Sequence, residues 1–215
     1  MEKNIIKKIK LTTTLNVITG LHIGASKENV EIGGIDNAVI KLSFKNGQPY
    51  IPGSSLRGKM RCLLEQTNGA AGVGKDNYTN KLFGSPSTIS KLIVRDSLLT
   101  DESEKELREC ESLEMPYTEG KWENVIDRTT GTAQHPRQME RIPAGAAFNI
   151  EFVVNVWSDD DEKELLGILN KCMSLLENDY LGGSGSRGYG QIKFGKKVYE
   201  VATDSTNWKM EEYNI

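Results

Sequence analysis

The stretch IGGID, residues 32–36, ends in a carboxylate that could do chemistry. An Asx turn is the ordinary role for an aspartate after two glycines, and on the residues alone it is the better interpretation of Asp36. The other role is an exposed catalytic carboxylate. Two-metal hydrolysis of DNA normally needs several carboxylates. RNA carries its own nucleophile, the 2′-hydroxyl, so one carboxylate could orient it, deprotonate it or hold a divalent metal.

The stretch GLHIG, residues 20–24, places His22 in a glycine-flanked loop. A single histidine is usually not catalytic. The only other histidine, His135, is distant in sequence, so a two-histidine nuclease lacks support, and the chain has no HExxH metal motif.

The stretch GGSGSRGYG, residues 182–190, is the most biased part of the chain. Its glycines match GxGxxG, but a dinucleotide fold needs that motif to follow a strand and open a helix. Here a helical pattern precedes it and a strand pattern follows. A helix C-cap and a tight turn at Gly182 and Gly183 would explain only part of this glycine content, because they do not require five glycines. Close approach to a polyanion explains more, with these candidate contacts: Gly183, Gly185, Ser186, Arg187, Gly188 and, as a stacking ring, Tyr189.

The stretch IPGSSLRGKMR, residues 51–61, gathers hydroxyls and cations at the predicted start of a helix. Helix N-termini bind phosphate, although a capped helix with a solvated basic face is an equally good interpretation. The candidate ligands here are Ser54, Ser55, Arg57, Lys59 and Arg61.

Residues 122–146 mix arginine with apolar residues, glycine and proline. This composition predicts a protruding hairpin or arm whose candidate contacts are Arg128, Arg137 and Arg141. Such an arm suits a wedge into a nucleic acid, whereas the ordinary alternative is a surface hairpin that covers the edge of a core.

The charge is segregated along the 215 residues. The net charge of −3 combines +6 over residues 1–61, −10 over residues 62–185 and +1 over residues 186–215. A protein that grips a polyanion needs one basic face rather than a basic total. Three widely spaced cysteines without a CxxC pattern predict neither a disulfide framework nor a zinc site, and they suit a reducing cytoplasm. No apolar run is long enough for a membrane helix, and the N-terminus lacks the features of a signal peptide.

The predicted elements form a single domain over residues 1–215. Alternating apolar residues predict strands near residues 9–17 and 148–156, and helical spacing predicts helices near 54–66 and 162–176. The stretches KLIVRDSLL (91–99) and QIKFGKKVYEV (191–201) are predicted as a short strand and a closing strand. Without the expected insertions, the order is strand, helix, strand, strand, helix, strand. This is the α+β, ferredoxin-like βαββαβ arrangement, shared with RNA-recognition (RRM-like) domains. The insertions are expected at about 68–121, as a lid, and 122–146, as a thumb-like β-hairpin.

These motifs, in this order, resemble the backbone subunit of the type III-A CRISPR effector (Csm) complex, a member of the RAMP superfamily. The resemblance rests on GLHIG, GGID, IPGSSLRGKMR, LFG, RDS, ENVIDR with PRQMER, and YLGGSGSRGYG, between about residues 9 and 194. It implies a filament of several copies on a CRISPR guide RNA, beside other Csm subunits. It also implies cleavage of complementary target RNA at regular intervals, with Mg²⁺ or another divalent metal.

The resemblance assigns roles to individual residues. The catalytic aspartate falls on Asp36, and the guide-binding histidine falls on His22. The thumb falls on residues 123–145, where Arg128 is the first residue expected to contact RNA, and the glycine-rich loop falls on residues 182–190. Some relatives carry zinc-binding cysteines in the lid, whereas residues 68–121 of this chain contain a single cysteine, Cys110, so no zinc is expected there. Asp36 is expected to hold a metal or orient the 2′-hydroxyl, since an aspartate of ordinary pKa is a weak base.

Two other functions stay open at the level of the sequence. One is a structural filament subunit that binds guide RNA without cutting. The other is an enzyme that acts on a small nucleotide through the GxGxxG match.

Overall fold

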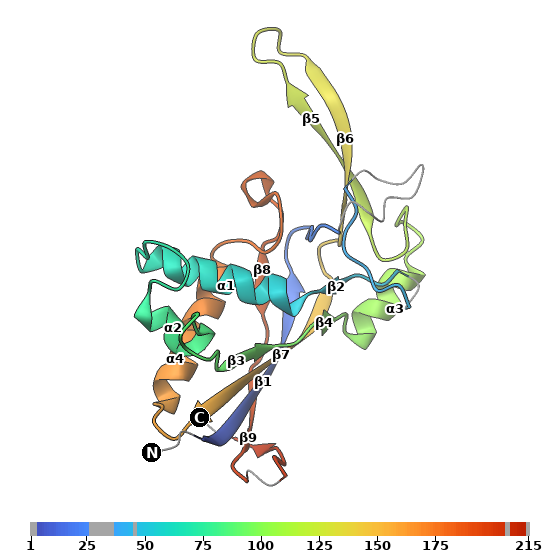
Figure 1. The fold of residues 1–215 in the computed structure, drawn as a ribbon. Coiled ribbons are helices and arrows are strands. Elements are labelled where there is room, and N and C mark those ends of the chain that lie inside the picture. The colour runs from blue at the N-terminus through green and yellow to red at the C-terminus, as the bar shows by residue number, and fades with distance from the viewer. Residues whose placement is uncertain (1–3, 26–36, 45–46, 205–206, 214–215) are drawn as a thin grey trace.

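A computed structural model describes residues 4–25, 37–44, 47–204 and 207–213, and the ribbon in Figure 1 shows their arrangement. Its helices are α1 (Gly53–Thr67), α2 (Asn77–Phe83), α3 (Asp101–Glu109) and α4 (Glu162–Glu177), with a short 3₁₀ turn, η2 (Gly185–Arg187). Its strands are β1 (Ile5–Val17), β2 (Tyr50–Ile51), β3 (Leu92–Val94), β4 (Ser97–Leu98), β5 (Glu119–Ile126), β6 (Ala133–Arg141), β7 (Ala147–Trp157), β8 (Ile192–Phe194), β9 (Val198–Ala202) and β10 (Glu211–Glu212).

The main sheet is antiparallel and has the order β10-β9-β1-β7-β3, with β8 also paired to β1. Strands β8, β1, β7 and β3 therefore lie side by side, joined along the chain by α1 and α4. This is the ferredoxin-like order, so the predicted α+β fold class is confirmed. The long pairing of β1 with β7 follows from the strict alternation of apolar residues in both strands.

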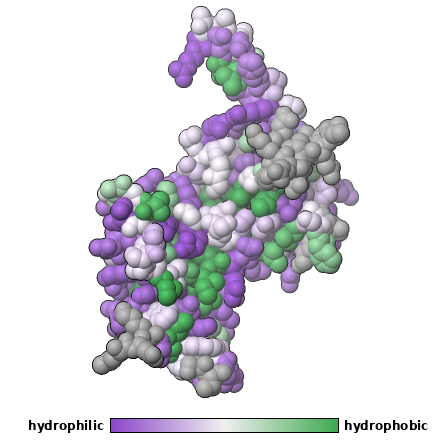
Figure 2. Space-filling view, in the orientation of Figure 1, coloured by the Kyte–Doolittle hydropathy of each residue, from purple (hydrophilic) through white to green (hydrophobic). Residues whose placement is uncertain are grey.

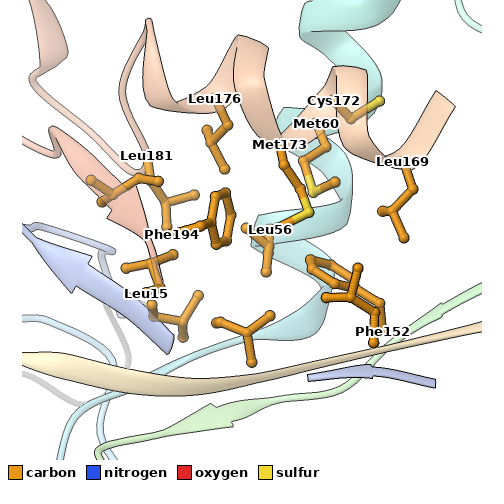
Figure 3. Packing of buried hydrophobic residues seen from close by; sticks show 14 of the residues in the cluster. Leu15, Leu56, Met60, Phe152, Leu169, Cys172, Met173, Leu176, Leu181 and Phe194 are labelled. Atoms are coloured by element: carbon orange, nitrogen blue, oxygen red, sulfur yellow. The ribbon is translucent and has the colours of Figure 1, made fainter. Parts of the chain in front are cut away.

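Helices α1 and α4 cover one face of the sheet, and the core lies between the two helices and the sheet (Figure 3). Leu56 and Met60 of α1 face Leu169, Cys172 and Met173 of α4, and all five are fully buried. Phe152, Leu15 and Phe194 complete the core from the strands. Because these apolar residues recur at helical spacing, each helix has one apolar face, and burial of that face against the sheet stabilises the packing.

The segment 68–121 is not one separate lid. Strand β3 lies within it and pairs with β7 as a core strand. Helix α2 packs beside α1 and α4, while α3 lies near the base of the hairpin (Figure 1). Asp76 begins α2 because its carboxylate accepts the backbone N–H groups of Tyr78 and Thr79.

Strands β5 and β6 form a hairpin that projects far beyond the body (Figure 1). It carries exposed apolar side chains, Trp122, Val125 and Ile126. Some of this apolar surface is visible on the projection in Figure 2. Within the described residues, no helix is long and apolar enough to cross a bilayer.

Candidate nucleic-acid interface

The GLHIG stretch lies where the glycine-rich loop meets the hairpin. His22 is 9% exposed, and its Nδ1 lies 2.7 Å from the backbone oxygen of Glu140 in β6. The backbone oxygen of His22 accepts the N–H of Gly183 at 2.8 Å, and that of Gly20 accepts the N–H of Gly190 at 3.1 Å. The structure therefore places His22 inside a joint between two candidate RNA-binding segments, with little of its surface free.

Glu140 is a buried carboxylate in the same joint, and the sequence motifs did not single it out. It is 2% exposed. Its Oε2 accepts the N–H of Val39 at 2.9 Å, and its Oε1 accepts the hydroxyl of Thr118 at 2.6 Å and pairs with Lys41 at 2.5 Å. Such a set of partners satisfies a charge that would otherwise be costly to bury. The sequence PRQMER predicts the burial of Glu140 only weakly. In a strand, Met139 and Glu140 lie on opposite faces, so a buried Met139 would leave Glu140 exposed, whereas both are buried here.

Asp36, the candidate catalytic residue, lies outside the described residues. The next residue, Asn37, is described, and its backbone oxygen accepts the N–H of Glu140 at 3.1 Å. Among the described residues, no three His, Cys, Asp or Glu side chains gather as a metal site. The metal role expected for Asp36 therefore stays a prediction.

Helix α1 does not begin as the sequence suggested. Neither Ser54 nor Ser55 caps it; the N-cap is Pro52, without a side-chain bond. Instead, the carboxylate of Asp96 accepts the N–H of Gly53 at 2.7 Å. A carboxylate from the RDS stretch thus occupies part of the helix N-terminus where a phosphate was expected.

The cations of α1 are turned toward the protein. Arg57 donates to the backbone oxygen of Phe83 at 2.7 Å, and burial, then the charge of Arg61, lower the pKa of its guanidinium. Lys59 lies 3.7 Å from the centroid of the Tyr180 ring. Arg61 pairs with Glu65 at 2.9 Å. Each of the three candidates therefore already has a partner within the chain.

The exposed face of α1 is instead lined by small residues. Ser54, Gly58 and Cys62 follow one another at helical spacing, and all three are exposed. No atom lies within 4 Å of where a side chain on Gly58 would begin. A surface without long side chains lets an extended backbone lie close to the helix.

The glycine-rich loop is built partly from glycines that the fold itself requires. Gly182 and Gly190 have positive φ, and a side chain on either would strike a backbone oxygen, at 2.2 and 2.0 Å. A side chain on Gly185 would overlap the ring of Tyr180 at 2.0 Å. Gly188 also has positive φ, but it faces open space.

The exposed tip of this loop is short, comprising Ser186, Arg187 and Gly188. The N–H groups of Gly183, Arg187, Gly188 and Gly190 already donate to backbone oxygens of the chain. Fewer N–H groups of the loop are therefore free to bind a polyanion. Only the tip of the loop, rather than its whole length, is available for such a contact.

Tyr189 does not present a stacking face. It is 1% exposed, with Lys121 at 4.4 Å and Arg141 at 5.2 Å from its ring centroid. Burial, then the Glu123 carboxylate, raise the pKa of Tyr189 to about 12. The ring is a packing element between loop and hairpin, so the stacking role expected for it does not fit this placement.

The three arginines of the hairpin differ in their surroundings. Arg128 is exposed at the turn. Arg137 pairs with Glu123 at 3.0 Å, and Arg141 pairs with Glu119 at 2.6 Å. Arg187, from the loop tip, reaches the same Glu123 oxygen at 2.9 Å. The structure thus joins Arg137 and Arg187 through Glu123, and it ties His22 to the same hairpin and loop through Glu140 and Gly183, while the α1 candidates lie on a separate element.

Comparison with known proteins agrees with this architecture. The RAMP superfamily matches residues 14–193. This chain belongs to the RAMP superfamily. Within the superfamily it is similar to proteins named CRISPR system Cms endoribonuclease Csm3, so the expected resemblance to the Csm backbone subunit is confirmed.

Three of these Csm3 relatives cover most of the chain. That of Methanocaldococcus jannaschii is 43% identical over 87% of this chain and 78% of its own length. That of Streptococcus thermophilus is 40% identical over 88% of both, and that of Mycobacterium tuberculosis is 38% identical over 95% and 94%.

Two solved structures share the fold. A Csm3–Csm4 subcomplex of the type III-A CRISPR-Cas interference complex has a chain 28% identical, with a TM-score of 0.60, that covers 97% of this chain and 90% of its own. A type III-B Cmr-beta complex bound to cognate target RNA has a chain 15% identical, with a TM-score of 0.65. The match covers 90% of this chain and 61% of the Cmr chain, and it shows the fold alone.

Proposed function

We propose that this chain is an RNA-binding backbone subunit of a type III-A CRISPR interference complex and an endoribonuclease that cuts RNA complementary to the guide. The observation that carries the proposal is identity of 37–43% to several Csm3 endoribonucleases over most of the chain. Its partners would be guide RNA, target RNA, further copies of the chain in a filament and other Csm subunits, in the cytoplasm.

The joint around His22 supports this proposal. It ties the loop, the hairpin and the segment after Asp36 to one another through backbone bonds. A rigid connection of this kind holds RNA-binding segments at a fixed separation, and orientation alone can supply a large share of a reaction barrier. We place the RNA along the exposed face of α1 and the loop tip, with the hairpin projecting across it.

The proposed chemistry is attack of the 2′-oxygen on the adjacent phosphorus. The P–O5′ bond breaks, and the products carry a 2′,3′-cyclic phosphate and a 5′-hydroxyl. Asp36 would hold Mg²⁺ or orient the nucleophile. Chelation of divalent ions should stop the reaction, and products with 5′-phosphate would contradict the use of the 2′-hydroxyl.

The test of the function uses the assembled complex. Labelled RNA complementary to the guide should be cut at regular intervals, and RNA of unrelated sequence should stay whole. Binding of complementary RNA without any cut would favour the structural, non-catalytic subunit instead.

A small-nucleotide enzyme is the other alternative, and the geometry does not favour it. The GxGxxG match follows α4 and precedes β8. The N–H groups of four residues in or beside the match already donate to backbone oxygens of the chain; these are Gly183, Arg187, Gly188 and Gly190. Binding of long RNA should weaken steeply with salt, since each neutralised phosphate of a single strand contributes a slope of about 0.7. Tight binding of ATP or NAD by the free chain would support the enzyme.

A further inference from the structure

Two arginines from separate segments share one oxygen of a single carboxylate. Arg137 of β6 and Arg187 of the loop tip lie 3.0 and 2.9 Å from Oε2 of Glu123 in β5. The side chain of Glu123 is 10% exposed, whereas those of Arg137 and Arg187 are 42% and 50% exposed. The carboxylate is therefore inside, and the two guanidinium groups face outward on either side of it.

The carboxylate is incompletely satisfied in this position. Within the described residues, Oε1 of Glu123 and the hydroxyl of Tyr189 are both buried, and neither makes a hydrogen bond of ordinary geometry. Burial acts to raise the pKa of the Glu123 carboxyl, but the Tyr189 hydroxyl and the two arginines outweigh it and lower the pKa overall. Glu123 is thus a charged group held in the interior by the Tyr189 hydroxyl and the two arginines, and its Oε1 has no hydrogen bond of ordinary geometry.

A phosphodiester would suit the same pair of arginines better. Each contact with Glu123 uses one nitrogen of a guanidinium group, which has five N–H donors in a planar fork. Phosphate accepts such forks bidentately, and it would approach from the exposed side of both side chains.

We propose that Glu123 occupies the place of an RNA phosphate in the free chain, and that a bound RNA backbone displaces it from Arg137 and Arg187. The proposal rests on the RNA-binding function proposed above. In the free chain Glu123 holds the hairpin to the loop tip and restrains RNA binding; in the bound state one phosphate bridges the same two segments.

The chain contains a matched control for this exchange. Glu119 is on the same strand and pairs with one arginine, Arg141, at 2.6 Å. The side chain of Arg141 is only 23% exposed and lies against Tyr189. Glu119→Gln therefore removes the same charge from the same hairpin without freeing two exposed arginines.

The experiment measures binding of fluorescein-labelled polyuridine to the full chain by anisotropy. Glu123→Gln should bind about five- to tenfold more tightly than wild type, and Glu119→Gln should change the affinity by about twofold at most. In a chain that also carries Arg137→Gln and Arg187→Gln, the gain from Glu123→Gln should shrink to that of Glu119→Gln.

Three outcomes would overturn the exchange. They are an equal effect of the two glutamate substitutions, a gain that persists without the arginines, and, in the wild-type chain, guanidinium ¹⁵N signals of Arg137 and Arg187 that do not move when polyuridine is added. The last measurement needs no variant, so it decides even if Glu123→Gln does not fold. A wild-type chain that binds no polyuridine at all would instead contradict the RNA-binding function itself, and the exchange with it.

Discussion

At the scale of single residues, the most consequential group is Glu140. It lies at the point where β6, the GLHIG segment and the residues after Asp36 meet. Its carboxylate accepts hydrogen bonds from Val39 and Thr118, and its backbone bonds to His22 and Asn37. One residue therefore fixes several segments.

Glu140→Ala should lower the free energy of unfolding by about 3 kcal/mol, because it leaves the N–H of Val39 and the hydroxyl of Thr118 buried without acceptors. Urea denaturation measures the loss. The matched control is Glu151→Ala, whose side chain is 38% exposed and pairs with Arg95 at 3.4 Å. That change should cost about 1 kcal/mol or less, and equal losses in both variants would contradict the role of Glu140.

The pKa of Tyr189 predicts how stability varies with pH. Because this pKa is raised in the folded chain to about 12, the native state keeps the phenol proton more tightly than the unfolded state does. The stabilisation is fully present below the ordinary tyrosine pKa of about 10 and is lost as pH rises toward 12. Between pH 9 and about 11, wild type should lose more stability than Tyr189→Phe in chemical denaturation. Parallel losses would contradict this.

Residue types predicted the RNA-binding candidates but not their partners. Arg57 and Tyr189 have the chemistry of a phosphate contact and a base stack, yet the fold turns both inward. The partner of Arg57 is 26 residues away in sequence and that of His22 is 118 residues away. Such contacts depend on the tertiary fold, which local spacing does not encode.

At the scale of elements, the start of α1 shows how a distant segment replaces an expected cap. Asp96→Ala removes the acceptor of the Gly53 N–H and should destabilise the chain by about 1 kcal/mol, whereas Asp96→Asn keeps an acceptor and should cost less. Thermal denaturation of both variants measures the difference. Ser54→Ala should have little effect, and a loss as large as that of Asp96→Ala would contradict the capping assignment.

The exposed face of α1 can be tested with two glycines. Gly58 in α1 and Gly167 in α4 are both helical and exposed, with no atom within 4 Å of an added side chain. Leucine at either position should stabilise the chain by about 0.5–1 kcal/mol through helix propensity. Only Gly58→Leu should weaken RNA binding, by about tenfold, as anisotropy would show. Equal RNA affinities of the two variants would remove α1 from the interface.

The elements of the core were predictable, and the additions to it were less so. Alternating apolar residues predicted β1 and β7, and apolar residues at helical spacing predicted α1 and α4. These patterns arise because each element must bury one face in the core. Helix α2 has no comparable signal, because its stretch, GVGKDNYTNKLF, is rich in glycine and asparagine and its start depends on the Asp76 side chain as cap.

At the scale of the whole molecule, the net charge of −3 conceals a localised arrangement. Arginines of the hairpin and loop converge at one end, but acids of the same hairpin, Glu119 and Glu123, neutralise part of that charge. Under the proposed function, each copy would therefore bind RNA through a few contacts. Several copies along one guide would multiply this modest affinity.

Cleavage by a complex assembled with Asp36→Ala tests the central claim most directly. The complex should bind complementary RNA as tightly as wild type and cut none of it, because the proposed guide-binding segments remain and the proposed metal-binding or orienting carboxylate is gone. Cleavage at the wild-type rate and at the same regular positions would contradict the assignment of the endoribonuclease activity to this chain's Asp36.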